Sequence, residues 1–196
     1  EWESSFEPIL VNDFVGIRAF FHQQITEVKH EIVITPKMSF GTGHHATTYM
    51  MIGQMESMAF NNKTVLDFGT GTAVLSILAE KMGASGIDAI DHDEWSIENA
   101  VENAAANNCN KIKLIKAETI AGNKVYDIIL ANINLNVILE NLAAIKAGSK
   151  NGTCILLSGF IKADEMMMIH ALAENKIFPL KIIQKGEWIC ILAHMN

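Results

Sequence analysis

The chain lacks the features that mark several common classes of protein. No apolar run approaches the roughly 18 residues of a membrane-spanning helix, and no cleavable signal is visible, so membrane insertion and secretion are disfavoured. Three widely separated cysteines, Cys109, Cys154 and Cys190, form no C-x-x-C pair, which argues against a disulfide framework and a zinc site. Basic residues form no runs, and 15 of them face 22 acidic residues. The net charge of -7 argues against duplex nucleic acid as a partner.

The chain does have enough apolar sequence for one good core. Its 196 residues are 49% apolar, which predicts a single compact domain with a short attached segment. The first residue is Glu1 rather than methionine, so we expect the chain to be part of a longer protein. The run Met166-Met167-Met168 is expected to pack in a helix rather than to bind a soft metal.

The most informative stretch is a short strand that runs into a glycine turn. Residues 65–73 read V-L-D-F-G-T-G-T-A and lead into a helical pattern. Gly69 and Gly71 let the chain bend sharply and let a ligand lie against backbone N–H groups at the helix N-terminus. A dinucleotide-binding turn would have a third glycine where Val74 stands, and its pyrophosphate would be repelled by Asp67. S-adenosylmethionine instead carries an ammonium and a sulfonium, so the turn favours this cofactor over NAD. Incidental glycines in a plain strand-turn-helix are the alternative.

A second acid ends the next predicted strand. Asp91 lies 22 residues after Gly69, the length of one helix and one returning strand in a βαβ unit. A carboxylate at the carboxyl end of this strand offers two oxygens to the hydroxyls of a ribose. Strand-end aspartates also cap helices, and here Asp93 is the better candidate for the cap of the following helix. We therefore predict that Asp91 binds the ribose.

The elements that follow alternate between helix and strand. The predicted helices lie near residues 49–59, 72–82, 95–107, 137–147 and 164–174, and the predicted strands near residues 87–91, 112–116, 126–131 and 153–158. Such alternation is typical of an α/β fold with a mostly parallel sheet covered on both faces. Residues 180–184 and 188–193 instead form two strands joined by a turn, which predicts an antiparallel C-terminal hairpin. The pattern is that of the Rossmann-like methyltransferases.

Two further loops carry polar residues that a core would not use. Residues 40–48 read F-G-T-G-H-H-A-T-T and precede a helix, so they make a good ligand loop, although Thr47 or Thr48 could simply cap that helix. Adjacent histidines with no third ligand at metal spacing give only weak support for zinc. Asn132 follows the fourth strand, at the edge of the sheet where ligands bind in open parallel sheets.

An asparagine at this position suits methyl transfer to an amine. Its carbonyl oxygen accepts a hydrogen bond from a neutral amine and aims the nitrogen lone pair at the methyl carbon, so catalysis is mainly positioning. No nucleophile elbow or His-Asp pair indicates hydrolytic chemistry. Asn132 is therefore the predicted catalytic residue. The alternative is that Asn132 and Asn134 only shape the turn.

Together these segments resemble the PrmA family, the bacterial methyltransferases of ribosomal protein L11. The resemblance spans nearly the whole chain and is most specific in the F-G-T-G-x-H-x-T-T loop. It implies contacts of the cofactor with Thr48, Gly69, Asp91 and Asn132, with Phe40, Asp67 and Gly71 close by. It also implies that His45, rather than His44, is the family's loop histidine. Three positions depart from the pattern: Ala73 replaces a glycine, Ala46 a proline, and Asp88 places an acid within a strand for no reason visible in the sequence.

The resemblance implies a protein N-methyltransferase that moves methyl groups from S-adenosylmethionine to amino groups of L11, on lysine side chains or the N-terminus. We expect residues 1–35 to be a linker and lead-in segment and residues 36–196 to be the catalytic domain, with the family's smaller L11-gripping domain missing. We further expect a cytoplasmic monomer with no metal, no direct nucleic-acid contact and no membrane contact. The alternatives are another protein or a small molecule as the amine acceptor, an NAD-dependent oxidoreductase, and a module that only senses S-adenosylmethionine.

Overall fold

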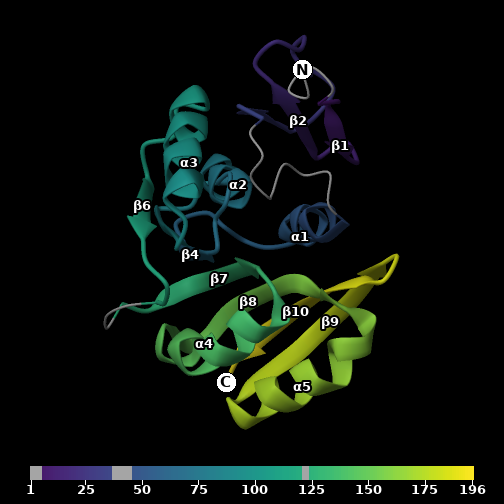
Figure 1. The fold of residues 1–196 in the computed structure, drawn as a ribbon, viewed down its shortest axis with the longest axis vertical. Coiled ribbons are helices and arrows are strands. Elements are labelled where there is room, and N and C mark those ends of the chain that lie inside the picture. Colours follow the sequence, from purple (N-terminus) through teal and green to yellow (C-terminus); the bar gives the residue numbers. More distant parts are fainter. Residues whose placement is uncertain (1–5, 37–45, 121–123) are drawn as a thin grey trace.

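A seven-stranded sheet dominates the computed structural model, which describes residues 6–36, 46–120 and 124–196 (Figure 1). Its strand order is β6-β5-β4-β7-β8-β10-β9, and only β10 runs against its neighbours. The strands are β4 (Thr64–Phe68), β5 (Gly86–Asp91), β6 (Ile112–Lys116), β7 (Tyr126–Asn132), β8 (Ser149–Ile161), β9 (Ile177–Lys185) and β10 (Trp188–Met195). The α/β fold with an antiparallel C-terminal hairpin is confirmed.

Helices cover the sheet on both faces. One face carries α1 (Ala46–Met55), α2 (Val74–Lys81) and α3 (Glu94–Ala106), and the other carries α4 (Leu135–Ala147) and α5 (Glu165–Glu174), which follows the short 3-10 helix η2 (Lys162–Asp164). Two apolar clusters, one on each face, form the core. Central strands such as β4 and β7 are buried on both faces, which explains their nearly continuous apolar sequences. No helix among the described residues is long and apolar enough to cross a membrane.

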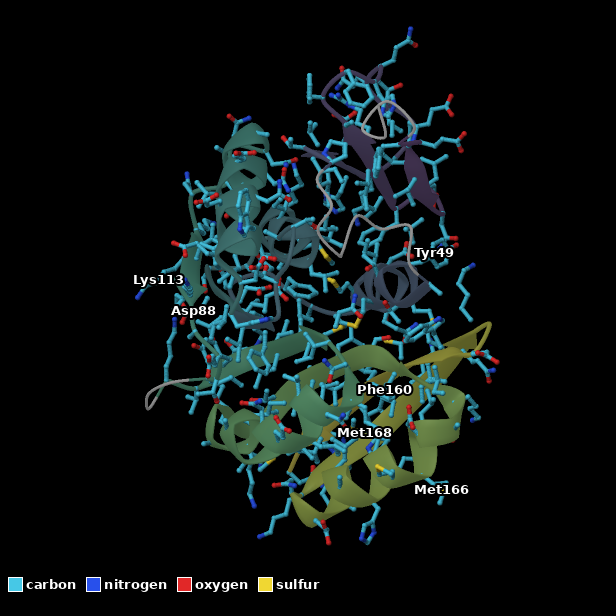
Figure 2. The ribbon with its side chains drawn as sticks, viewed as in Figure 1. Tyr49, Asp88, Lys113, Phe160, Met166 and Met168 are labelled. Carbon is cyan, nitrogen blue, oxygen red and sulfur yellow. The ribbon has the colours of Figure 1, made fainter. Side chains whose placement is uncertain are left out.

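Two sequence predictions need correction in detail. Helix α1 begins at Ala46 rather than at residue 49 and ends early, because tight turns from Gln54 to Ser57 and from Met55 to Met58 close it. In α5 only Met168 of the methionine run packs in the core, on the face shared with Phe160 (Figure 2). Met166 is 74% exposed because it lies on the opposite side of the helix.

The first 35 residues contain a small sheet of their own. Strands β1 (Ile9–Val11), β2 (Val15–Ala19) and β3 (His30–Ile34) pair in this order, β1 with β2 antiparallel and β2 with β3 parallel. Their inward residues are fully buried in the same cluster as α1 and α2. Strands of three and five residues are too short to show a clear period, so the sequence did not reveal them. The division at residue 35 remains a prediction.

The structure accounts for Asp88, which had no explanation from sequence. Its carboxylate accepts hydrogen bonds from Tyr126 Oη at 2.7 Å and Lys124 Nζ at 2.6 Å. Asp88, labelled in Figure 2, is on β5 and Tyr126 is on β7, so this bond crosses β4, the strand between them. Burial, together with the neighbouring Asp88, raises the pKa of Tyr126 above its usual value, so the phenol stays protonated as a donor. Asp88 therefore stabilises the sheet by linking β5 to β7.

Candidate active site

The glycine turn between β4 and α2 has the conformation that the sequence predicted. Gly69 and Gly71 have φ values of 78° and 54°, in the region that favours glycine. The backbone N–H groups of Gly69 and Thr70 both donate to the carbonyl oxygen of Ile90 on β5, at 2.8 and 2.9 Å. A Cβ atom on Gly69 would lie 2.1 Å from Cγ2 of Ile133, in the loop after β7. Glycine at position 69 is thus required both by the turn and by the neighbouring loop.

Ala73, the last residue of the turn, has a conformation that the sequence did not reveal. Its φ is 62°, in the left-handed region, and α2 begins directly after it with no side-chain cap. Alanine in this region costs roughly 1 kcal/mol. The change from glycine to alanine here therefore affects the backbone as well as packing.

Asp67 is a buried acid beside this turn. Its Oδ2 atom accepts hydrogen bonds from Thr70 Oγ1 at 2.7 Å and Ser76 Oγ at 2.6 Å. Its Oδ1 atom is buried and has no hydrogen-bond partner among the described residues. Burial raises the pKa of Asp67 to about 6, with a further contribution from the charge of Asp91, against the lowering effect of the two hydroxyl donors. An unpaired buried carboxylate oxygen is costly, and a cationic ligand would offset that cost.

Asp91 ends β5 on the other side of the turn. Its Oδ2 atom accepts from the backbone N–H of Gly71 at 2.9 Å and its Oδ1 atom from that of Asp93 at 3.0 Å, while His92 Nδ1 lies 3.4 Å from Oδ1. Each carboxylate oxygen has a second lone pair for a ligand hydroxyl. Asp93, not Asp91, caps α3 by accepting from the N–H of Ser96 at 2.9 Å, as expected. Asp91 instead orients the glycine turn through its hydrogen bond from Gly71.

Asn132 and Thr48 meet although 84 positions separate them. Asn132 Nδ2 donates to Thr48 Oγ1 at 3.1 Å, which joins the end of β7 to α1. Thr48 is buried within the first turn of α1, so it does not cap that helix. Asn134, two residues after Asn132, caps α4 by accepting from Val137 N–H at 3.1 Å. The structure therefore gives the two asparagines different tasks.

Two residues of β8 shape this loop and were missed from sequence. Ser158 accepts the backbone N–H of Ile133 at 3.1 Å, and Gly159 has a φ of 101°. A Cβ atom on Gly159 would lie 2.1 Å from the carbonyl oxygen of Ile133. The only available signal was a glycine directly after the strand predicted at residues 153–158; the structure extends this strand through Gly159, and a glycine within a strand can mark a close backbone approach. Phe40, His44 and His45 lie outside the described residues.

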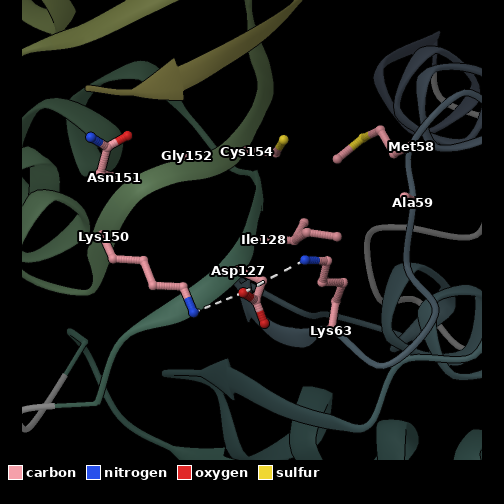
Figure 3. Close-up of a pocket in the computed structure, with 9 residues that line it drawn as sticks. All are labelled: Met58, Ala59, Lys63, Asp127, Ile128, Lys150, Asn151, Gly152 and Cys154. Atoms are coloured by element: carbon pink, nitrogen blue, oxygen red, sulfur yellow. Dashed lines mark ion pairs between the residues drawn. The ribbon is translucent and has the colours of Figure 1, made fainter.

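A pocket lies at the opposite end of the central strands (Figure 3). Met58, Lys63, Asp127, Lys150 and Cys154 contribute to its lining. Asp127 accepts from Thr64 N–H at 2.9 Å and faces Lys150 Nζ at 2.8 Å. The hydrogen bond from Lys150 lowers the pKa of Asp127 to about 2. The carboxylate of Asp127 thus has its hydrogen-bond and charge partners within the protein. We therefore interpret the Asp127–Lys150 pair in this pocket as structural rather than as part of a reaction site.

The described residues contain no group of three or more His, Cys, Asp or Glu that could hold a metal ion. The three cysteines are free, and burial raises the pKa of the Cys190 thiol to about 12. A thiol with a raised pKa is a poor nucleophile, so Cys190 is suited to packing rather than to thiolate chemistry.

Comparison with known proteins decides the family. All 196 residues match the family described as Ribosomal protein L11 methyltransferase (PrmA). The chain belongs to the PrmA family. The ribosomal protein L11 methyltransferase of Porphyromonas gingivalis is 42% identical over 167 residues, which cover 84% of this chain and 58% of that protein. That of Phocaeicola vulgatus is 37% identical over 199 residues, covering 94% of this chain and 71% of the relative.

PrmA relatives also include a solved structure. The crystal structure of ribosomal protein L11 methylase from Lactobacillus delbrueckii subsp. bulgaricus matches with a TM-score of 0.89 and 27% identity, covering 97% of this chain and all of that one. The chain thus has the class I methyltransferase fold, and it spans 58% of the length of the Porphyromonas relative.

Proposed function

We propose that this chain is the catalytic part of a protein N-methyltransferase, which transfers methyl groups from S-adenosylmethionine to amino groups of ribosomal protein L11. The observation that carries the proposal is the pair of acids around the glycine turn. Asp67 has a buried oxygen with no hydrogen-bond partner among the described residues, and Asp91 faces the same turn, so the two acids bring negative charge to it. A cationic cofactor is attracted there, whereas an anionic pyrophosphate would be repelled.

The described residues fit S-adenosylmethionine, which supplies an electrophilic methyl group when bound. Asp91 would accept hydrogen bonds from the ribose hydroxyls with the lone pairs that Gly71 and Asp93 leave unused. Gly69 and Gly71 would let the cofactor lie against the backbone at the start of α2. Asp67 would contribute its negative charge near the amino-acid end. Phe40 would lie close by, but it falls outside the described residues.

Asn132 would orient the acceptor amine. Its amide nitrogen donates to Thr48, which leaves the amide carbonyl oxygen as the hydrogen-bond acceptor for an incoming N–H group. An amine held in this way keeps its lone pair directed toward the methyl carbon. Thr48 therefore contributes by fixing the rotamer of Asn132.

The choice of L11 as substrate rests on the names of the relatives, which are called ribosomal protein L11 methyltransferases. Another protein or a small-molecule amine is the alternative acceptor. With this assignment we also propose that residues 1–35 link the catalytic domain, residues 36–196, to a separate L11-binding domain, and that the protein is a cytoplasmic monomer that contacts neither nucleic acid nor membrane.

Radiolabelled methyl transfer tests the proposal. Labelled S-adenosylmethionine is incubated with the chain and with ribosomal proteins from a strain that lacks its own enzyme. We expect label in L11 and a rise in melting temperature with S-adenosylmethionine but not with NAD. Stabilisation by NAD alone would contradict the cofactor assignment. Binding of S-adenosylmethionine with no methyl transfer to any amine would favour a module that only senses the cofactor. Label in another acceptor, and none in L11, would contradict L11 as the substrate.

A further inference from the structure

We propose that Asn103 is a positioning residue that connects the residue after β3 to the glycine turn and holds the turn in the conformation that binds the cofactor. The proposal rests on the proposed cofactor site but concerns a residue outside it. Asn103 is on α3 and is fully buried.

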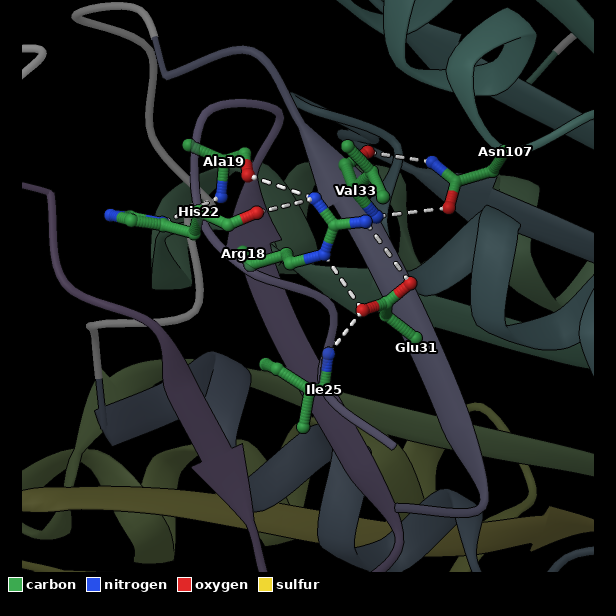
Figure 4. A network of polar contacts seen from close by, with 7 residues as sticks. All are labelled: Arg18, Ala19, His22, Ile25, Glu31, Val33 and Asn107. Atoms are coloured by element: carbon green, nitrogen blue, oxygen red, sulfur yellow. Dashed lines mark hydrogen bonds and ion pairs between the residues drawn. The ribbon is translucent and has the colours of Figure 1, made fainter. Parts of the chain in front are cut away.

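Three asparagines on one side of α3 pair with the end of the N-terminal sheet. Asn99, Asn103 and Asn107 are spaced by four residues and therefore share a helix face. Asn107 accepts the N–H of Val33 at 3.0 Å and donates to its carbonyl oxygen at 2.6 Å (Figure 4). The N–H of Thr35 donates to Asn103 Oδ1 at 2.8 Å.

These contacts pair with the free edge of β3, where a neighbouring strand would otherwise bind. β3 is an edge strand of its sheet, and edge backbone groups need partners when they are buried. A carboxamide has a donor and an acceptor arranged like those of a peptide group, so the asparagines extend the hydrogen bonding of β3 onto a helix. Asn99 completes this pairing by donating to the carbonyl oxygen of Thr35 at 3.3 Å.

Asn103 differs from Asn107 because its second bond reaches the glycine turn. Asn103 Nδ2 donates to the carbonyl oxygen of Thr72 at 3.0 Å. Thr72 stands between Gly71 and Ala73, which both have positive φ, and the N–H of Gly71 donates to Asp91. One buried carboxamide thus holds the backbone of the turn and the residue that follows β3.

The paired variants Asn103→Ala and Asn107→Ala separate this role from plain structural support. Both remove a buried bond to the backbone of residues 33–35, so both should lower the melting temperature. Only Asn103→Ala removes the hydrogen bond to the Thr72 carbonyl oxygen. We therefore expect the affinity of this variant for S-adenosylmethionine to fall by about 5-fold or more, the lower range of a typical coupling between sites, while that of Asn107→Ala changes less than twofold. Calorimetric titration of each variant measures this difference.

A second readout needs no cofactor. In the free protein, amide hydrogen exchange at Gly71 should become faster in Asn103→Ala and stay as in the wild type in Asn107→Ala, because Gly71 adjoins the released carbonyl. If Asn103→Ala does not fold, Asn103→Asp keeps an acceptor for Thr35 N–H, loses the Nδ2 donor to Thr72 and Asn99, and places an acid beside the Thr72 carbonyl oxygen, so it should also weaken the cofactor and speed exchange at Gly71. Equal affinity and equal Gly71 exchange in the paired variants would overturn the proposal. A wild-type chain that does not bind S-adenosylmethionine would instead contradict the proposed function.

Discussion

Two aspartates on neighbouring strands of the same sheet have opposite surroundings. Asp67, near the carboxyl end of β4, is fully buried with one oxygen unpaired among the described residues, and burial raises its pKa to about 6. Asp127, near the amino end of β7, receives hydrogen bonds from Lys150 and Thr64, which lower its pKa to about 2. Strands β4 and β7 pair directly and in parallel, so the two acids lie at opposite ends of neighbouring strands.

The contrast distinguishes the end of the sheet with the proposed cofactor site from the end with the ion pair. The protein satisfies Asp127 with its own groups and thereby gains stability. It leaves Asp67 with a desolvation cost that a ligand of opposite charge would offset, which is typical of a functional site. Each prediction below changes one end of the sheet and compares it with a matched control.

The largest effect is expected for Asn132→Ala at the carboxyl end. Loss of the amide removes the hydrogen bond that orients the amine, so single-turnover methyl transfer to L11 should fall by about 100- to 1,000-fold. Cofactor affinity should fall less. The control Asn151→Ala lines the pocket at the amino end and should leave the rate within about twofold. A collapse of affinity with a normal rate would make Asn132 a cofactor ligand only.

Asp67→Asn should stabilise the ligand-free protein at high pH. The folded-state pKa of Asp67 is raised, so the folded protein binds more protons than the unfolded chain between about pH 4 and pH 6, and stability falls as pH rises through this window. The neutral amide avoids this loss, which is at most about 3 kcal/mol at pH 8 and near zero at pH 4. Urea unfolding at both pH values measures it, and affinity for S-adenosylmethionine should fall in the same variant.

Asp127→Asn is the matched change at the other end and should have the opposite sign. The pKa of Asp127 is lowered in the folded protein, so its contribution is present above about pH 4 and is lost as pH falls toward 2. Because solvent screens its lysine partner, we expect a loss of only about 1 kcal/mol at pH 8. Cofactor affinity should not change. If Asp67→Asn and Asp127→Asn both stabilised the folded protein at pH 8, the two acids would not have opposite effects on stability.

Asp91→Asn should weaken the cofactor without a large effect on the fold. The amide keeps the shape of the side chain but loses acceptor capacity toward the ribose hydroxyls, at a cost of about 1 to 3 kcal/mol of binding free energy by calorimetry. Asp93→Asn is the control, since asparagine caps a helix as well as aspartate does and removes the same charge. Unchanged affinity in Asp91→Asn would exclude Asp91 from the site.

The smallest effect is expected for Ala73→Gly. Glycine relieves the left-handed conformation of residue 73 but gains entropy in the unfolded chain, so we expect a net stabilisation of about 0.5 kcal/mol. Ala79→Gly, inside α2, should destabilise by about 1 kcal/mol because glycine is a poor helix former. Equal destabilisation by both changes would show that the left-handed conformation of Ala73 does not cost stability.

Most of the fold could be predicted from the chain because its signals are local. The glycine turn, the apolar strands and the final pair of strands each occupy one short stretch of consecutive residues, and strand-helix alternation then implies a parallel sheet. The N-terminal sheet was missed, because strands as short as Ile9–Val11 carry too few residues to show alternation.

The sequence by itself determined the residue types of the proposed site, with Asp67, Gly69, Gly71 and Asp91 placed by their spacing within one βαβ unit. Only the tertiary structure decided which distant residues meet: Thr48 with Asn132, Gly159 with Ile133, Asn103 with the glycine turn, and Tyr126 with Asp88. These contacts join segments 26 or more residues apart, and no local pattern encodes such a pairing. The pKa values of Asp67 and Asp127 differ for the same reason, since burial and ion pairing depend on neighbours that folding supplies.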